Sequence, residues 1–221
     1  MNNVNTLIIG DLHAPFIRQG YLEFCKKVAK DYKCKNVICV GDVLDNAATT
    51  YHELEPDGLS AGDELKEAKK QLKAWYKAFP NMKICIGNHD ARVMRKFKTG
   101  GISKEWFKPY AEVIGCPNWT FAEHLIENGI KFTHGEGQRA EKRMISDRIS
   151  IVQGHRHSEA YVKWSVSDYD RLFAMQIGWG GNQSAYSMNY AKDFAKGVVS
   201  CGVIYNGLPI VIPMPLLPKI K

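Results

Sequence analysis

Three short apolar runs in the first half of the chain end in a glycine followed by Asp or Asn, and helix-like sequence separates them. The runs span residues 7–9, 37–40 and 83–86, and they precede Gly10-Asp11, Gly41-Asp42 and Gly87-Asn88. Strands that alternate with helices pair in parallel through right-handed crossovers. Because the carboxyl ends of parallel strands meet at one edge of a sheet, we expect the three polar segments to lie close together.

The sequence between these runs has the spacing of amphipathic helices. One helical pattern extends from about residue 17 to 30, and another from 61 to 79 continues until Pro80 stops it. The second half differs, because strand-like runs dominate at 130–133, 149–152, 161–166, 172–177 and 198–205. The proline-rich tail from Gly207 suits an edge strand followed by an extended end. We therefore expect an α/β chain with a parallel first half and a more β-rich second half.

Asp, Asn and His side chains recur in five short segments. They are Asp11-Leu-His13, Gly41-Asp42-Val-Leu-Asp45, Gly87-Asn88-His89-Asp90, His134-Gly135 and Gly154-His155-Arg-His157. Two divalent cations about 3.5 to 4 Å apart need roughly this many nitrogen and oxygen ligands, one of them a shared carboxylate. Five of the seven histidines lie in these segments, which leaves only His52 and His124 without a role. The pattern predicts a two-metal hydrolytic site, and the absence of thiolates from it argues against a closed structural zinc site.

Length, charge and cysteine content bound what surrounds this site. The 221 residues are 45% hydrophobic and contain no linker or repeat, so we expect one domain over residues 1–221. No apolar run approaches the roughly 20 residues of a membrane span, and the start lacks a signal-peptide pattern, so we expect a cytoplasmic protein without membrane contact. The six cysteines show no C-x-x-C spacing, which favours reduced thiols. The formal charge of +7 favours an anionic partner, and the sequence leaves a homo-oligomer open.

The order of the five segments resembles that of the calcineurin-like metallophosphoesterases and extends over residues 11–157. The resemblance implies two β-sheets packed face to face with flanking helices, a four-layer α/β/β/α sandwich. It also implies how two metal ions would be held: the first by Asp11, His13 and His157, the second by Asn88, His134 and His155, and both by the bridging Asp42. We expect manganese, with iron, zinc, nickel or magnesium as alternatives that the same ligands suit.

The resemblance also implies a mechanism. A hydroxide between two cations would be the nucleophile, because a metal can lower the pKa of bound water from about 15.7 to around 7. His89 is the candidate general acid for the leaving oxygen, and Asp45 matches the family position of the carboxylate that orients it. The alternative for Asp45 is that it caps a turn, and we expect Asp90 to begin a helix as an N-terminal acidic residue.

Departures from the protein Ser/Thr phosphatases of this superfamily bear on the substrate. Those enzymes have Arg directly after the position of Asp45 and Glu after G-N-H, where this chain has Asn46 and Asp90. The pattern looks more like the phosphodiesterase and nuclease branches, so we expect a phosphodiesterase that acts on nucleic acid or nucleotides. The alternative is a phosphomonoesterase acting on a small metabolite or a phosphoprotein. A non-catalytic scaffold on the same fold is a third class, and the complete ligand set with His89 argues against it.

Candidate substrate contacts lie just beyond the ligand segments. We expect Asn88 and Arg92 to touch the phosphate, and Arg139 and Arg143 to come next. Between the segments, residues 46–60, which include His52, could form a lid. The glycine-rich loop at 178–186 could rim the cleft, and a close backbone approach explains its glycines equally well.

A basic stretch at residues 92–108 carries six Lys or Arg and one Glu. It could track a phosphodiester backbone, with Trp106, Phe107 and Tyr110 available to stack on bases. The alternative is a solvated amphipathic helix whose aromatic side chains lie in the core.

Overall fold

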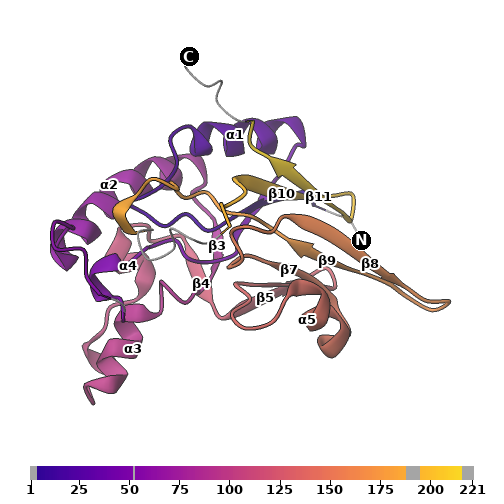
Figure 1. The fold of residues 1–221 in the computed structure, drawn as a ribbon. Helices are drawn as coiled ribbons and strands as arrows, with labels where there is room; N and C mark the ends of the chain where they lie inside the picture. Colours follow the sequence, from indigo (N-terminus) through magenta and orange to yellow (C-terminus); the bar gives the residue numbers. More distant parts are fainter. Residues whose placement is uncertain (1–3, 52, 188–194, 216–221) are drawn as a thin grey trace.

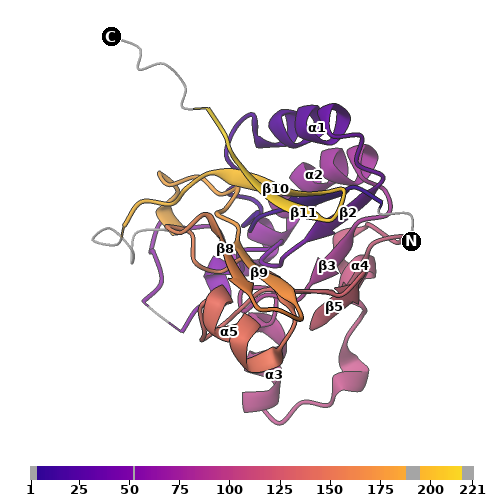
Figure 2. The same cartoon turned by 90° about the vertical axis from the view of Figure 1, so that its right-hand side faces the viewer.

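The computed structural model describes residues 4–51, 53–187 and 195–215, and two β-sheets pack face to face at its centre. Helices α1 (Tyr21–Asp31) and α2 (Ala61–Ala78) cover the outer face of the first sheet, and α5 (Ala140–Asp147) covers the outer face of the second (Figure 1, Figure 2). The layers therefore run helix, sheet, sheet, helix. This arrangement confirms the predicted α/β/β/α sandwich.

The first sheet has six strands in the order β11-β10-β1-β2-β3-β4. They are β1 (Thr6–Ile9), β2 (Asn36–Cys39), β3 (Lys83–Cys85), β4 (Thr120–Ala122), β10 (Ser200–Tyr205) and β11 (Leu208–Pro213). Strands β1 to β4 pair in parallel, as the alternation with helices predicts, and β10 runs antiparallel to β1. The proline-rich β11 is the predicted edge strand, and residues 216–221 of the tail lie outside the described residues.

The second sheet has five strands in the order β5-β6-β7-β9-β8. They are β5 (His124–Glu127), β6 (Ile130–Thr133), β7 (Ser150–Gln153), β8 (Tyr161–Val166) and β9 (Arg171–Gln176). The central three are parallel, and the edge strands β5 and β8 are antiparallel to their neighbours. The carboxyl ends of β6, β7 and β9 therefore share one edge of this sheet.

Alternate side chains of the strands enter different layers, because successive residues of a strand point to opposite faces. In β1, Leu7 and Ile9 pack beneath the helices of the first layer, and Ile8 packs between the two sheets. All three are fully buried. On the far side of the second sheet, Met144 of α5 packs against Ile151 of β7. A strand buried on both faces needs a continuous apolar run, which is why these strands are readable in the sequence.

The helices begin and end at local sequence signals. Helix α1 begins at Tyr21 rather than at residue 17, because Gly20 has a φ of 82° and a helix cannot pass through that conformation. Helix α2 begins after Ser60, whose hydroxyl accepts the N–H of Asp63, and it ends before Pro80 as predicted.

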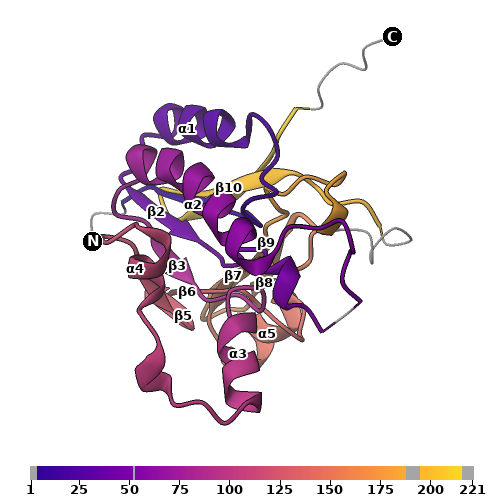
Figure 3. The same cartoon turned by 90° about the vertical axis from the view of Figure 1, so that its left-hand side faces the viewer.

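The basic stretch is broken into short elements rather than one helix. They are α3 (Arg92–Thr99) and the 3-10 turn η2 (Lys104–Trp106), and α4 (Tyr110–Ile114) follows directly after the stretch. Another 3-10 turn, η1, covers Ala47–Thr49 between β2 and α2. Figure 3 shows α3 projecting from the body of the molecule. Among the described residues, no helix combines the length and apolar character that crossing a membrane requires.

Candidate active site

The five polar segments meet because each follows a strand of a parallel group. Asp11, Asp42 and Asn88 follow β1, β2 and β3, while His134 and His155 follow β6 and β7. Hydrogen bonds join the two sheets at this edge. The backbone N–H of His155 donates to Asp11 Oδ2 at 2.8 Å, and His134 Nδ1 lies 3.1 Å from the carbonyl oxygen of Val40.

One group of donor atoms is formed by Asp11, His13 and His157. His13 Nε2 lies 3.1 Å from His157 Nε2, which lies 3.3 Å from Asp11 Oδ2. Asp11 and His13 are buried, and the His157 side chain is 19% exposed. These are the ligands that the family resemblance of the sequence implies for the first metal.

A second group is formed by Asn88, His134 and His155. His134 Nε2 lies 2.8 Å from Asn88 Oδ1, which lies 2.9 Å from His155 Nδ1. Asp42 stands between the two groups, because its Oδ2 is 3.1 Å from His134 Nε2 and 3.9 Å from His13 Nε2. The structure therefore brings all seven predicted ligands together, with the predicted bridging carboxylate in the middle.

The hydrogen-bond chemistry of this cluster fits metal ions. His13 Nδ1 lies 2.7 Å from Asp45 Oδ1, and His134 Nδ1 faces a backbone carbonyl, so both rings donate their protons outward. In its neutral form, each ring turns an Nε2 lone pair toward other acceptor atoms, an arrangement that a cation satisfies. Asp11 Oδ1 is buried without a hydrogen-bond partner in the described part of the chain.

The electrostatics of the cluster also fit a bound cation. Burial alone would lower the pKa of His134, but Asp42 and Asp11 raise that pKa to about 10. Burial alone would raise the pKa of Asp42, but His134 and His89 hold it well below its usual range. The buried carboxylates thus demand positive charge at this point, which either a proton or a metal ion supplies.

The backbone around the cluster is strained and tightly packed. His13, Asp42 and His155 have φ values of 51°, 48° and 70°, a region that costs a non-glycine residue about 1 to 3 kcal/mol. The motif glycines make room for the carboxylates, since a Cβ on Gly87 would collide with Asp42 Oδ1 and one on Gly154 with Asp11 Oδ1. Such strain concentrates at functional sites.

Asp45 and Arg92 place His89 beside the predicted metal ligands. Its Nδ1 lies 3.0 Å from Asp45 Oδ1 and 2.8 Å from the Asp45 carbonyl oxygen, and the Arg92 guanidinium lies 2.9 Å from its Nε2. Burial alone would lower the pKa of His89, but Asp42 and Asp45 raise it. Asp45 orients two rings, because the same oxygen also contacts His13 Nδ1. In the described residues its carboxylate contacts these rings rather than a turn N–H.

The prediction for Asp90 is wrong. Helix α3 begins at Arg92 without a side-chain cap, and Asp90 is buried beneath the site instead. Its two oxygens accept the backbone N–H groups of Leu44 and Gly87, at 2.9 and 3.0 Å, and so tie the loop after β2 to the loop after β3. Burial and the nearby Asp42 raise the pKa of Asp90 to about 7. The sequence places Asp90 just before a helix, but in the fold its carboxylate points inward, because the N–H groups of Leu44 and Gly87 lie there.

The predicted arginine contacts differ in their surroundings. Arg92 is 9% exposed, and its guanidinium donates to the carbonyl oxygens of Asp45 and Asn46 at 3.0 and 3.3 Å. Arg139 lies at the surface and pairs with Glu159 at 3.2 Å, while Arg143 donates to a backbone carbonyl. Only Arg92 therefore touches a residue of the predicted catalytic set among the described contacts.

Sequence reasoning missed Trp179, which packs against two of the predicted metal-ligand histidines. Its ring stacks on His157 at a centroid distance of 4.5 Å and an interplanar angle of 14°, and it meets His13 edge-on at 5.9 Å. The glycines around it reflect close packing, since a Cβ on Gly180 would collide with the Tyr21 ring. A Trp flanked by glycines directly after a strand was the signal that could have revealed it.

The aromatic residues of the basic stretch separate into two kinds. Phe107 packs on Phe97 at 4.0 Å, and Tyr110 stacks on Phe121 at 5.3 Å, so each ring is already engaged by a neighbouring ring and is half-buried. Trp106 is 81% exposed and remains available for stacking. The exposed side chain of Lys96, in α3, lies over the Tyr51 ring, and its Nζ is 4.1 Å from the ring centroid.

The sequence profile of the calcineurin-like phosphoesterase family matches residues 4–195. The chain belongs to this family. Members of the family act on phosphate esters and bind divalent metals, and the His and Asp clusters described above offer suitable donor atoms. No protein of curated function matches the chain significantly.

Several solved structures are similar to this calcineurin-like phosphoesterase. Vacuolar protein sorting 29 from Cryptosporidium parvum is 16% identical, with 96% of each chain covered and a TM-score of 0.47. The phosphoesterase YfcE from E. coli is 15% identical, with 95% of this chain and 92% of that chain covered and a TM-score of 0.46. The nuclease MPE from Pseudomonas putida is 12% identical, with 95% and 87% covered and a TM-score of 0.41.

Proposed function

We propose that this calcineurin-like phosphoesterase uses two divalent metal ions, manganese in the first instance, to hydrolyse phosphodiester bonds of nucleotides or nucleic acid. The observation that carries the proposal is the convergence of seven nitrogen and oxygen side chains in two groups that share Asp42. When bound, the ions would activate a water molecule and neutralise charge on the phosphoryl oxygens. The oxygen of water adds to phosphorus, and the bond from phosphorus to the leaving oxygen breaks.

His89 is the group that would protonate the leaving oxygen. Its Nδ1 proton is held by Asp45, so the proton that is transferred must leave from Nε2. Arg92 occupies that nitrogen at 2.9 Å, and a phosphate oxygen would compete for the same guanidinium. Substrate binding would then free Nε2 to carry the proton. Arg92 and Asn88 are thus the proposed phosphate contacts, and Arg139 is a weaker candidate because Glu159 already pairs with it.

The residue at position 46 supports a diester over a monoester. The Asn46 side chain donates to the backbone carbonyl oxygen of His89 at 2.9 Å, and the backbone carbonyl oxygen of Asn46 accepts from Arg92 at 3.3 Å, so residue 46 contributes contacts here but no charge. A monoester dianion requires more positive charge than a diester monoanion. The site therefore suits the diester better than a site with an additional arginine would.

A side-by-side assay tests this proposal. The purified protein with Mn²⁺ is offered bis-p-nitrophenyl phosphate and p-nitrophenyl phosphate, and we expect the higher kcat/KM with the diester. A preference for the monoester would make the phosphomonoesterase alternative correct. No hydrolysis of either ester, although metal is bound, would support the scaffold alternative instead.

Nucleic acid as substrate has its own test on the basic stretch. Arg95, Lys96 and Lys98 are exposed on α3, so Lys96→Ala and Lys98→Ala should each flatten the dependence of log Kd for single-stranded DNA on log salt by about 0.7. Trp106→Ala should weaken binding by about 1 to 3 kcal/mol through the lost stacking. Fluorescence anisotropy at several salt concentrations measures both effects.

Matched controls for this test lie elsewhere on the surface. Lys77→Ala removes an exposed lysine from α2, and Trp164→Ala removes a tryptophan that is 45% exposed on β8. Neither should change the slope or the affinity. If the controls and the α3 variants behave alike, the stretch is a solvated surface and nucleotides become the better substrate class.

A further inference from the structure

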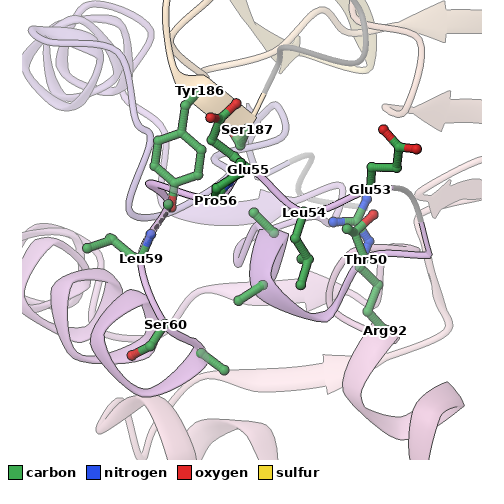
Figure 4. A pocket seen from close by; sticks show the side chains of 14 residues that line it. Thr50, Glu53, Leu54, Glu55, Pro56, Leu59, Ser60, Arg92, Tyr186 and Ser187 are labelled. Atoms are coloured by element: carbon green, nitrogen blue, oxygen red, sulfur yellow. Dashed lines mark hydrogen bonds between the residues drawn. The ribbon is translucent and has the colours of Figure 1, made fainter.

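A pocket of about 940 Å³ opens beside Arg92. Its walls come from two parts of the chain that are distant in the sequence, the described residues of 47–50 and 53–61 between β2 and the start of α2, and residues 186–187 at the end of the glycine-rich loop (Figure 4). These are the two segments whose sequence suggested a lid and a rim, although His52 lies outside the described residues. The volume lies within the range of small-molecule sites, about 300 to 1,000 Å³.

The pocket walls are held in place by buried and aromatic anchors. Tyr186 accepts the N–H of Leu59 through its hydroxyl at 2.9 Å, and its ring meets Phe16 at 5.0 Å. On the opposite side, Glu64 is buried and its carboxylate accepts the N–H groups of Ala47 and Ala48, each at 2.8 Å. These contacts hold Tyr186 and both ends of the first wall segment in place before a ligand enters, which lowers the entropic cost of binding.

The lining combines an apolar wall with negative charge. Leu54, Pro56 and Leu59 supply apolar surface, whereas Glu53 and Glu55 supply carboxylates (Figure 4). Arg92 is the one cationic side chain among the described lining residues. An uncharged group of the size of a ring would bury apolar surface against this wall, whereas the Glu53 carboxylate would repel a second phosphate.

Arg92 connects the pocket to the reaction, because it lines the pocket and also contacts His89 Nε2. The pocket therefore lies on the side of the group that protonates the leaving oxygen. Resting on the proposed function, we infer that the pocket binds the leaving alcohol of the ester, and that this alcohol is uncharged, ring-sized and free of a second phosphate. A terminal nucleoside or the nucleoside of a nucleotide diester has this chemistry, whereas an internal nucleotide of a strand does not.

A binding experiment tests the pocket without the reaction. Thymidine is titrated calorimetrically into the protein, and binding is expected. Ala61→Trp, in the pocket wall at the start of α2, should weaken it by about 10-fold or more, since an indole would fill the space. Ala74→Trp, at an exposed position farther along α2, is the matched control and should bind as the wild type does. Absence of thymidine binding to the wild type, or equal binding by both variants, overturns the inference.

A kinetic experiment tests the charge argument. With Mn²⁺, a thymidine dinucleoside monophosphate is compared with the same compound carrying a further phosphate on either terminal hydroxyl. For at least one of the phosphorylated compounds, we expect kcat/KM to be lower by a factor of about 10 or more. Glu53→Lys should narrow that gap, and Glu123→Lys, at an exposed position that does not line the pocket, should leave it unchanged.

The two experiments separate the two proposals. Thymidine binding that is sensitive to Ala61→Trp, without hydrolysis of any ester, supports the pocket and contradicts the proposed function. Hydrolysis that is indifferent to a second phosphate and to Ala61→Trp leaves the proposed function intact and overturns the pocket.

Discussion

Asp42→Asn is expected to abolish hydrolysis almost completely and to weaken metal binding. Asp42 Oδ2 faces both donor groups, so the substitution removes a negative charge from the one carboxylate that both ions would share. Loss of a residue that only supports a metal ligand already costs roughly 10- to 100-fold. We expect a shared ligand to cost more, so kcat should fall below about one hundredth of the wild-type value. Chelation should have the same effect on the wild type, and Mn²⁺ should restore its activity.

The substitution is well suited to this test because it should preserve the fold. Asp42 has a φ of 48°, a conformation that Asn adopts more readily than most residues. Its Oδ1 accepts the backbone N–H of His89 at 2.8 Å, and an amide oxygen can accept the same bond. The circular dichroism spectrum of the variant should therefore match that of the wild type. Its metal content, measured by elemental analysis, should fall below the value near two metals per chain that we expect for the wild type. Asp31→Asn, at the exposed end of α1, is the control. Full activity of Asp42→Asn in the presence of a chelator would rule out the metal-dependent mechanism.

The positions of the predicted ligands were readable because they depend on strand order alone. Strands buried on both faces leave continuous apolar runs such as residues 7–9, and the residue after each parallel strand must lie at the same edge of the sheet. The short edge strand β5 was missed because only one of its faces is partly buried, which leaves an alternating pattern of four residues. Helix α5 was missed for a similar reason, since only Ala140 and Met144 of its eight residues are buried.

Contacts made across the fold could not be predicted from the sequence. The inward turn of Asp90 depends on two N–H groups, from Leu44 and Gly87, that come together only when β2 and β3 pair. The stacking of Trp179 on His157 depends on β9 ending beside β7. The spacing of residues along the chain carries no information about such long-range contacts. The same holds for the pocket, whose two wall segments are separated by more than half of the chain.

The position of His89 links the metal cluster to the proposed leaving-group pocket. Asp45 holds the Nδ1 side of the ring and also orients the predicted ligand His13, so the orientation of the proposed acid and of the proposed metal site depends on one carboxylate. Arg92 contacts the opposite nitrogen and lines the pocket. Substitutions at Asp45 would therefore disturb metal binding and proton transfer together, whereas substitution of His89 itself separates the two.

His89→Ala is expected to lower kcat by about 10² to 10⁴ for esters with a poor leaving group, such as a nucleoside, while the metal content stays near normal. The reason is that a nucleoside alkoxide must be protonated as it leaves, and His89 is the buried imidazole that Asp45 and Arg92 fix beside the site. With p-nitrophenyl esters the loss should be much smaller, because p-nitrophenolate leaves without a proton. His124→Ala, in β5 and outside the five ligand segments, is the matched control and should leave both substrates unaffected. Equal losses on good and poor leaving groups would show that His89 shapes the site without acting as the acid, and loss of metal would place it among the ligands, as its proximity to His13 and Asp42 also allows.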